Sequence, residues 1–263
     1  MEILKRNGLS FVEMDMVTES ESNNVAKELL ENLFFDMAKL STKYDNDTFC
    51  DLPYTYSERR LDSVLLPVLS KLCKTKVLVE IPAVRRCANR RFQVNESNGR
   101  IDYWCIYKNY SFVIELKQSY DCFTTNSTRE RKVIKPWLKM NEQLESLEHE
   151  VKEYQESTKG VVRIGLHIIT SYSDKKPCNQ LIKQFHANIS KTSDRLLKDL
   201  GKKYPSLKPD LMICWKIPTR IVMDGEQTFP GLWTVARIYP AIKHSGYVEA
   251  WITDGYQAKD FGL

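Results

Sequence analysis

The chain has 263 residues, of which 42% are hydrophobic and 28% charged, and its formal net charge at pH 7 is +5. This length suits one large domain or a core with an appended subdomain, and the composition excludes a disordered, collagen-like or coiled-coil protein. The small positive charge is compatible with a polyanionic partner but does not require one.

The sequence lacks the signals of several protein classes. No stretch approaches the roughly 18 uncharged apolar residues of a membrane span, and no apolar leader with a cleavage site begins the chain. The seven cysteines are odd in number and form no CxxC pair, which argues against a disulfide framework and structural zinc. P-loop, GxGxxG, GxSxG and HExxH motifs are also missing. We therefore expect a cytoplasmic protein with no membrane association.

The N-terminal segment 1–54 predicts a helix followed by a loop. Apolar residues recur every four positions within Glu19–Leu40, and Ser20 or Ser22 is suited to cap that helix. Residues 41–54 are polar and contain the turn-like sequence Asp-Asn-Asp, so we expect a loop there.

The segment 55–172 predicts the order helix, strand, strand, strand, helix, strand. The first helix has an apolar face from Leu61 to Leu72, and the second is expected to begin at Pro136 and reach Tyr154. The four strands are expected at 76–84, 101–107, 111–118 and 161–170.

The segment 173–263 predicts a further α/β extension. A helix is expected at 179–200, and strands are expected at 211–217, 232–239 and 247–252. The pattern leaves open whether this third extends the same sheet or forms a small subdomain. The fold class is α/β in either case, with a mixed central sheet flanked by helices.

The charged residues of two of these strands carry the chemical information. Glu115 and Lys117 point to the same face of an otherwise apolar strand. If residues 108–109 form a two-residue hairpin turn, counting back along both strands places Asp102 directly opposite Glu115, with Cβ atoms roughly 5 Å apart. Two carboxylates so placed repel, and a hard divalent cation relieves that repulsion.

This constellation resembles the PD-(D/E)xK nuclease superfamily, also called restriction-endonuclease-like, over about the middle 115 residues. The resemblance consists of an acidic residue on the first helix, an Asp on the second strand, Glu-x-Lys on the third, and the order αβββαβ. Those positions are matched by Glu58, Asp102, Glu115 and Lys117. The Pro of the motif is replaced by Ile101.

The resemblance implies a catalytic site that uses Mg²⁺, for which Mn²⁺ can substitute. Asp102, Glu115 and the backbone carbonyl of Leu116 would hold the metal, and Glu58 would position a water or a second metal. Lys117 would orient the attacking water or stabilise the transition state. Gln118, directly after the motif, is a weaker candidate for contact with water or substrate.

Some of these residues have a simpler interpretation. Thr55-Tyr-Ser-Glu58 fits the capping-box pattern, so Glu58 could serve the helix instead of the site, or do both. A single Glu-x-Lys on a strand is more often a surface ion pair than a catalytic motif. His167 lies in an apolar strand and is expected to be a core residue.

Three basic clusters are candidates for contact with phosphates, with nearby aromatic residues stacking on bases. The alternative is that each cluster is a solvated loop. The first two clusters are favoured because they lead into the strand of Asp102. The nucleic-acid candidates are Arg85, Arg86, Arg90, Arg91, Arg131 and Lys132. Arg131 and Lys132 belong to the third cluster, which lies beside Phe123 and Trp137.

The sequence thus favours a magnesium-dependent nuclease, an endonuclease acting on DNA rather than RNA. A homodimer would suit symmetric duplex cleavage. Two alternatives stay open. One is a catalytically silent nuclease-fold module that binds nucleic acid or a protein. The other is an unrelated α/β interaction protein, in which Asp102 and Glu115 lie far apart.

Overall fold

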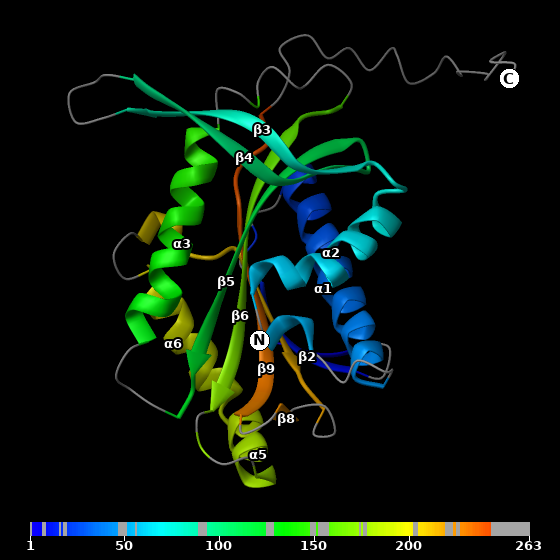
Figure 1. Cartoon of the computed structure of the whole chain (residues 1–263), viewed down its shortest axis with the longest axis vertical. Helices are drawn as coiled ribbons and strands as arrows, with labels where there is room; N and C mark the ends of the chain where they lie inside the picture. The colour runs from blue at the N-terminus through cyan, green and yellow to red at the C-terminus, as the bar shows by residue number, and fades with distance from the viewer. Residues whose placement is uncertain are drawn as a thin grey trace, which may run out of the picture.

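The computed structural model describes residues 2–6, 9–15, 17, 20–46, 52–55, 57–88, 94–124, 129–147, 151, 158–173, 175, 178–201, 205–218, 223–224 and 227–242. They form an α/β fold in which one mixed sheet is covered by helices on both faces (Figure 1). No helix in these ranges is long and apolar enough to cross a membrane.

The sheet has the strand order β1-β2-β7-β9-β6-β5-β4-β3, and β8 pairs with β9. All neighbours are antiparallel except β5 and β6, which are parallel. The strands are β1 (Glu2–Arg6), β2 (Leu9–Asp15), β3 (Val77–Ala88), β4 (Val94–Tyr107), β5 (Tyr110–Cys122), β6 (Val161–Ser173), β7 (Leu211–Lys216), β8 (Met223–Asp224) and β9 (Gln227–Ile238).

The helices cover the sheet in two groups. One face packs against α1 and α2, and the other packs against α3 and α6, so the core has two halves separated by the sheet (Figure 1). The helices are α1 (Glu21–Asn46), α2 (Glu58–Leu72), α3 (Arg129–Ser146), α5 (Asn179–Ala187) and α6 (Ile189–Gly201), with 3-10 turns at Pro53–Thr55 and Pro205–Leu207.

Strand β6 lies inside the sheet and is buried along nearly its whole length, because both of its faces are covered. Its neighbour helix α3 approaches so closely that a Cβ added to Gly165 would lie 2.6 Å from the Met140 side chain. The glycine therefore fixes the spacing between α3 and the centre of the sheet.

The predicted order of helix, three strands, helix and strand is confirmed as α2, β3, β4, β5, α3 and β6. The α/β class, with a mixed sheet flanked by helices, is also confirmed. The C-terminal strands β7 and β9 lie between β2 and β6, so the C-terminal third extends the central sheet.

Several local predictions are wrong. The segment 41–54 is not wholly a loop, because α1 continues to Asn46 and a 3-10 turn follows. Helix α3 begins at Arg129, so Pro136 lies inside it rather than in its first turn. The single helix expected at 179–200 is two helices that meet at Asn188, whose side chain binds the Gln184 carbonyl.

The N-terminal pair β1 and β2 was not predicted. Strand β2 pairs with β7, which lies more than 190 residues further along the chain, so no local sequence pattern predicts this contact. The strand expected at 247–252 lies outside the described residues.

Candidate active site

The hairpin of β4 and β5 has the register that its turn predicts. Both residues of the 108–109 turn have positive φ, 45° and 63°, as a two-residue type I′ turn requires. Backbone pairing then extends from the turn to Tyr103↔Ile114. The next residues along the two strands are Asp102 and Glu115.

Strands β4 and β5 separate directly after this pair. The Leu116 N–H donates to Asp102 Oδ2 at 2.7 Å, and the Gln118 N–H donates to Glu58 Oε2 at 3.1 Å. Beyond this point β4 and β5 no longer pair with each other. Strand β4 keeps its other neighbour β3, and β5 keeps its other neighbour β6. The two strands therefore form a fork. On the edge of β5 that faces the fork, backbone N–H groups donate to side-chain carboxylates instead of to a neighbouring strand.

The contact with Gln118 also settles the local role of Glu58. The residue before the helix is Ser57, which makes no side-chain capping bond, and Glu58 is the first residue of α2. The capping-box interpretation is therefore wrong, because Glu58 reaches across to β5 instead of back to its own backbone.

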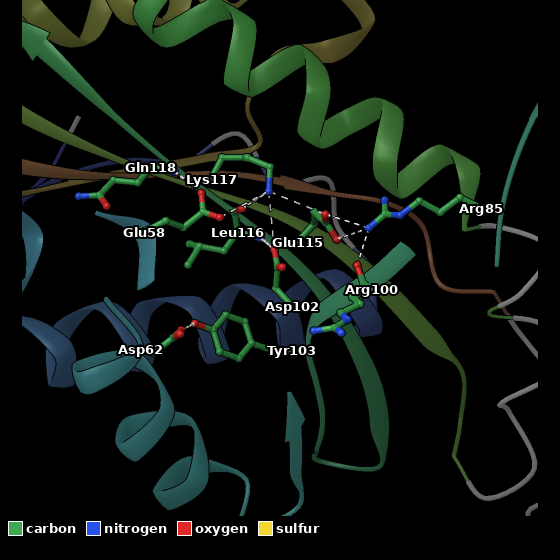
Figure 2. Close-up of polar contacts among 10 residues, drawn as sticks. All are labelled: Glu58, Asp62, Arg85, Arg100, Asp102, Tyr103, Glu115, Leu116, Lys117 and Gln118. Carbon is green, nitrogen blue, oxygen red and sulfur yellow. Dashed lines mark hydrogen bonds and ion pairs between the residues drawn. The ribbon is translucent and has the colours of Figure 1, made fainter. Parts of the chain in front are cut away.

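The Lys117 ammonium lies at the centre of an oxygen cluster (Figure 2). Its Nζ is 3.8 Å from Glu58 Oε1, 3.8 Å from Asp102 Oδ2 and 3.8 Å from Glu115 Oε1. It also donates to the Leu116 carbonyl oxygen at 2.5 Å. One cationic group thus faces three carboxylates and one carbonyl, the same oxygen atoms that the sequence nominates as metal ligands.

Arg85 holds the most buried of these carboxylates from the other side (Figure 2). Its Nη2 donates to both oxygens of Glu115, at 3.1 and 3.3 Å, and to the Arg100 carbonyl at 2.5 Å. A Cβ added to Gly99 would lie 2.2 Å from Arg85 Nε. Gly99 therefore leaves the room in which the guanidinium lies.

The carboxylates of the cluster are harder to ionise than free ones. Burial raises the pKa of Glu115 to about 7, and the charge of Asp102 adds to this effect while Arg85 and Lys117 oppose it. Burial also raises the pKa of Asp102 and of Glu58, each opposed most strongly by Lys117. A cation that binds between these groups would favour their ionised forms.

An acidic cavity of about 280 Å³ opens beside the cluster, between α2 and β3. Asp62 and Glu80 line it together with Glu58 and Asp102. Sequence reasoning missed both of these residues. Asp62 lies four residues after Glu58, on the same face of α2, and that spacing could have indicated it. Its carboxylate accepts a hydrogen bond from the Tyr103 hydroxyl.

The first basic cluster lies elsewhere than expected. Arg85 and Arg86 belong to strand β3 rather than to a loop. Arg85 is buried against Glu115, so it is not placed on the surface for a phosphate, whereas Arg86 is exposed. Arg90 and Arg91 lie outside the described residues.

The third cluster lies at the start of α3. Arg131 is part of the helix, but its side chain is outside the described part of the chain. Lys132 is exposed, and its Nζ lies 3.4 Å from the Tyr172 hydroxyl. Trp137 cannot stack on a base, because it is fully buried and donates to the Leu207 carbonyl. His167 is buried as expected, with Ser119 as its partner.

Among the described residues, no group of three or more His, Cys, Asp or Glu side chains forms a ready-made metal site. The carboxylates of the cluster surround an ammonium group at 3.8 Å, whereas Mg²⁺ binds oxygen at roughly 2.0–2.1 Å. The donor set itself, carboxylate and carbonyl oxygens, is the one that Mg²⁺ prefers.

Comparison with known proteins gives little to place beside this geometry. No protein-family model matches the chain, and no curated protein matches it. Among solved structures, the crystal structure of SSO0001 is similar at 17% sequence identity, over 58% of this chain and 73% of that one, with a TM-score of 0.22. A likeness this weak carries no argument about fold or function.

Proposed function

We propose that the chain is a metal-dependent nuclease with a restriction-endonuclease-like core, an endonuclease that hydrolyses phosphodiester bonds of DNA in preference to RNA. One observation carries the proposal: oxygen atoms of Glu58, Asp102, Glu115 and Leu116 converge on a single cationic group. The order αβββαβ and the hairpin register give independent support.

Asp102, Glu115 and the Leu116 carbonyl would hold Mg²⁺ or Mn²⁺, with Glu58 at the edge of the site. When bound, the metal lowers the pKa of a coordinated water and neutralises charge on the phosphate. Lys117 would donate hydrogen bonds to the attacking water or to a phosphate oxygen as negative charge builds there. Gln118 acts as a positioning residue, because its backbone N–H fixes the Glu58 carboxylate.

The silent-module alternative has one observation in its favour. Arg85 already neutralises Glu115 in a buried ion pair, so the carboxylate has a partner without a metal. A protein that had abandoned catalysis could keep this pair for stability. The two functions differ in metal affinity, because only the nuclease must bind Mg²⁺ between the carboxylates.

A cleavage assay tests the proposal. Purified protein is incubated with plasmid, linear duplex, single-stranded DNA and RNA, in the presence of Mg²⁺, Mn²⁺ or EDTA. Lys117→Ala and Asp102→Ala are compared with Lys71→Ala, a matched control on α2 whose side chain is 74% exposed and paired with Asp36. We expect metal-dependent cutting by the wild type and the control, and its loss in both site variants.

Calorimetric titration with Mg²⁺ and Mn²⁺ completes the test. Folded wild-type protein that binds neither metal and cuts no substrate would favour the silent module. Cutting that persists in both site variants would place the active site elsewhere.

A further inference from the structure

A second cavity, of about 520 Å³, lies beside the candidate active site near the ends of β5 and β6. Its wall includes the aromatic residues Tyr120, Tyr172 and Phe229 and the basic residue Lys132. The acidic cavity between α2 and β3 has the opposite character. One cavity near the site is therefore lined by carboxylates, and the other is lined by aromatic rings and a lysine.

The rings of this cavity are held in place. Tyr120 and Tyr172 meet edge to face, with ring centroids 6.3 Å apart and an interplanar angle of 82°. The Lys132 ammonium lies 5.8 Å from the centre of the Tyr172 ring and 3.4 Å from its hydroxyl. The Tyr172 carbonyl accepts the Phe123 N–H at 3.1 Å, which ties this end of β6 to the end of β5. Such rings offer flat apolar faces without needing to be ordered by a ligand.

Gln118 connects the cavity with the candidate active site. The backbone N–H of Gln118 binds Glu58 in the oxygen cluster, while its side chain lines the cavity. Tyr120 lies two residues beyond Gln118 on the same face of β5, roughly 7 Å away at the rise of a β-strand, and the Glu58 carboxylate that Gln118 binds lies 3.8 Å from the Lys117 ammonium. A nucleotide whose phosphate lay at Lys117 could therefore place a neighbouring base in the cavity.

We propose that the cavity binds one unpaired base of a single-stranded nucleic acid next to the cleaved bond. This inference rests on the proposed function and names the substrate class of the same site. The base stacks on Tyr172 or Tyr120, and Lys132 contacts the adjoining phosphate. A base inside a duplex must first be unpaired and turned out of the stack, which costs about a few kcal/mol, so the cavity favours a single strand.

Binding in EDTA tests the proposal without relying on cleavage. Labelled single-stranded DNA, RNA of the same sequence and a hairpin duplex are titrated by fluorescence anisotropy. In a parallel series, 2-aminopurine replaces each base of the DNA strand in turn. We expect the wild type to prefer the single strands and to change 2-aminopurine fluorescence at one position. The two single strands show whether the site distinguishes DNA from RNA.

The tyrosine variants supply the controls. Tyr172→Ala should weaken single-strand binding by about 5- to 100-fold and abolish the fluorescence change, as expected for loss of a stacking platform. Tyr172→Phe keeps the ring and should bind within about twofold of wild type. Tyr44→Ala, which removes a partly buried tyrosine on α1, should leave binding unchanged.

Thermal melting of each variant separates loss of the cavity from loss of the fold. Equal affinity for duplex and single strand, or wild-type binding by folded Tyr172→Ala, would overturn the inference while leaving the nuclease proposal intact. Position-specific single-strand binding without cutting in Mg²⁺ or Mn²⁺ would support base binding in the cavity and would overturn the proposed nuclease function.

Discussion

Asp102 Oδ2 accepts the backbone N–H of Leu116 at 2.7 Å, just beyond Tyr103↔Ile114, the last backbone pair of the β4–β5 hairpin. Asp102 therefore has two separable properties. Its oxygen serves as an acceptor for the edge of the sheet, and its charge serves the oxygen cluster around Lys117.

Asp102→Asn and Asp102→Ala should separate these two properties. Asparagine keeps an acceptor for the Leu116 N–H, so we expect the free energy of unfolding to change by less than about 1 kcal/mol. Alanine leaves that N–H without its partner and should cost about 1–3 kcal/mol. Both should lower metal-dependent cleavage at least about 100-fold. Urea denaturation in EDTA measures the first effect. An equal loss of stability in both variants would show that the charge holds the fork.

The buried pair of Arg85 and Glu115 makes a second prediction. Above about pH 7, where Glu115 is ionised, Arg85→Met should destabilise the fold by about 3–5 kcal/mol, because it removes the hydrogen-bonded cation of a buried carboxylate and leaves only Lys117, at 3.8 Å, to balance its charge. Adding Glu115→Gln should recover much of that loss, and a double-mutant cycle in urea measures the coupling. If Arg85→Met instead weakened nucleic-acid binding at unchanged stability, Arg85 would be the phosphate contact expected from the sequence.

Gly99 should be sensitive to a single methyl group. The added Cβ of Gly99→Ala would overlap Arg85 Nε and Cδ, so the guanidinium would have to leave its place. We expect a cost of about 1–3 kcal/mol, typical of overpacking. The same substitution in an Arg85→Ala background should cost far less, because the atoms that clash are then gone. Thermal melting of the four proteins would check this, and an unchanged cost would point to backbone strain.

The raised pKa of Glu115 predicts a pH dependence of stability in EDTA. The folded protein keeps the Glu115 proton up to about pH 7, while the unfolded chain releases it near 4.5. The folded state therefore binds more protons in this window, so the free energy of unfolding falls as pH rises from about 4.5 to 7.

The comparison with Glu115→Gln isolates this effect. His167 has a lowered pKa of about 3, because it is buried as the neutral ring, and it acts in the opposite direction. Subtracting the variant's urea-denaturation curve from the wild type's cancels His167 and other groups. We expect the wild type to lose stability relative to the variant up to about pH 7 and not beyond. A flat difference would mean that Glu115 ionises normally.

The sequence predicts one half of the site well, because a two-residue turn fixes the register of a hairpin. Residues 108–109 suffice to place Asp102 and Glu115 at neighbouring positions on adjacent strands. Alternation along β5 then adds Lys117 to the face of Glu115. Each step depends on contacts that are local in the chain.

The other half depends on contacts between distant segments. Nothing near Arg85 indicates that it turns inward to Glu115, because the space for it is created by Gly99 on the neighbouring strand. The fork is likewise invisible locally, since β4 pairs on toward β3 while Glu58, from a separate helix, binds β5. The pairing of β2 with β7 is of the same kind.

Strand β3 ends the sheet, and it exposes Leu78 and Val79, whose exposed fractions are 62% and 44%. An apolar edge of this kind invites another strand to add to it. Two features prevent a continuous ladder: Glu80 has a φ of 52°, which turns the backbone out of strand geometry, and Pro82 has no N–H to donate. The distortion that faces Asp102 thus also protects this edge from growing into an aggregate.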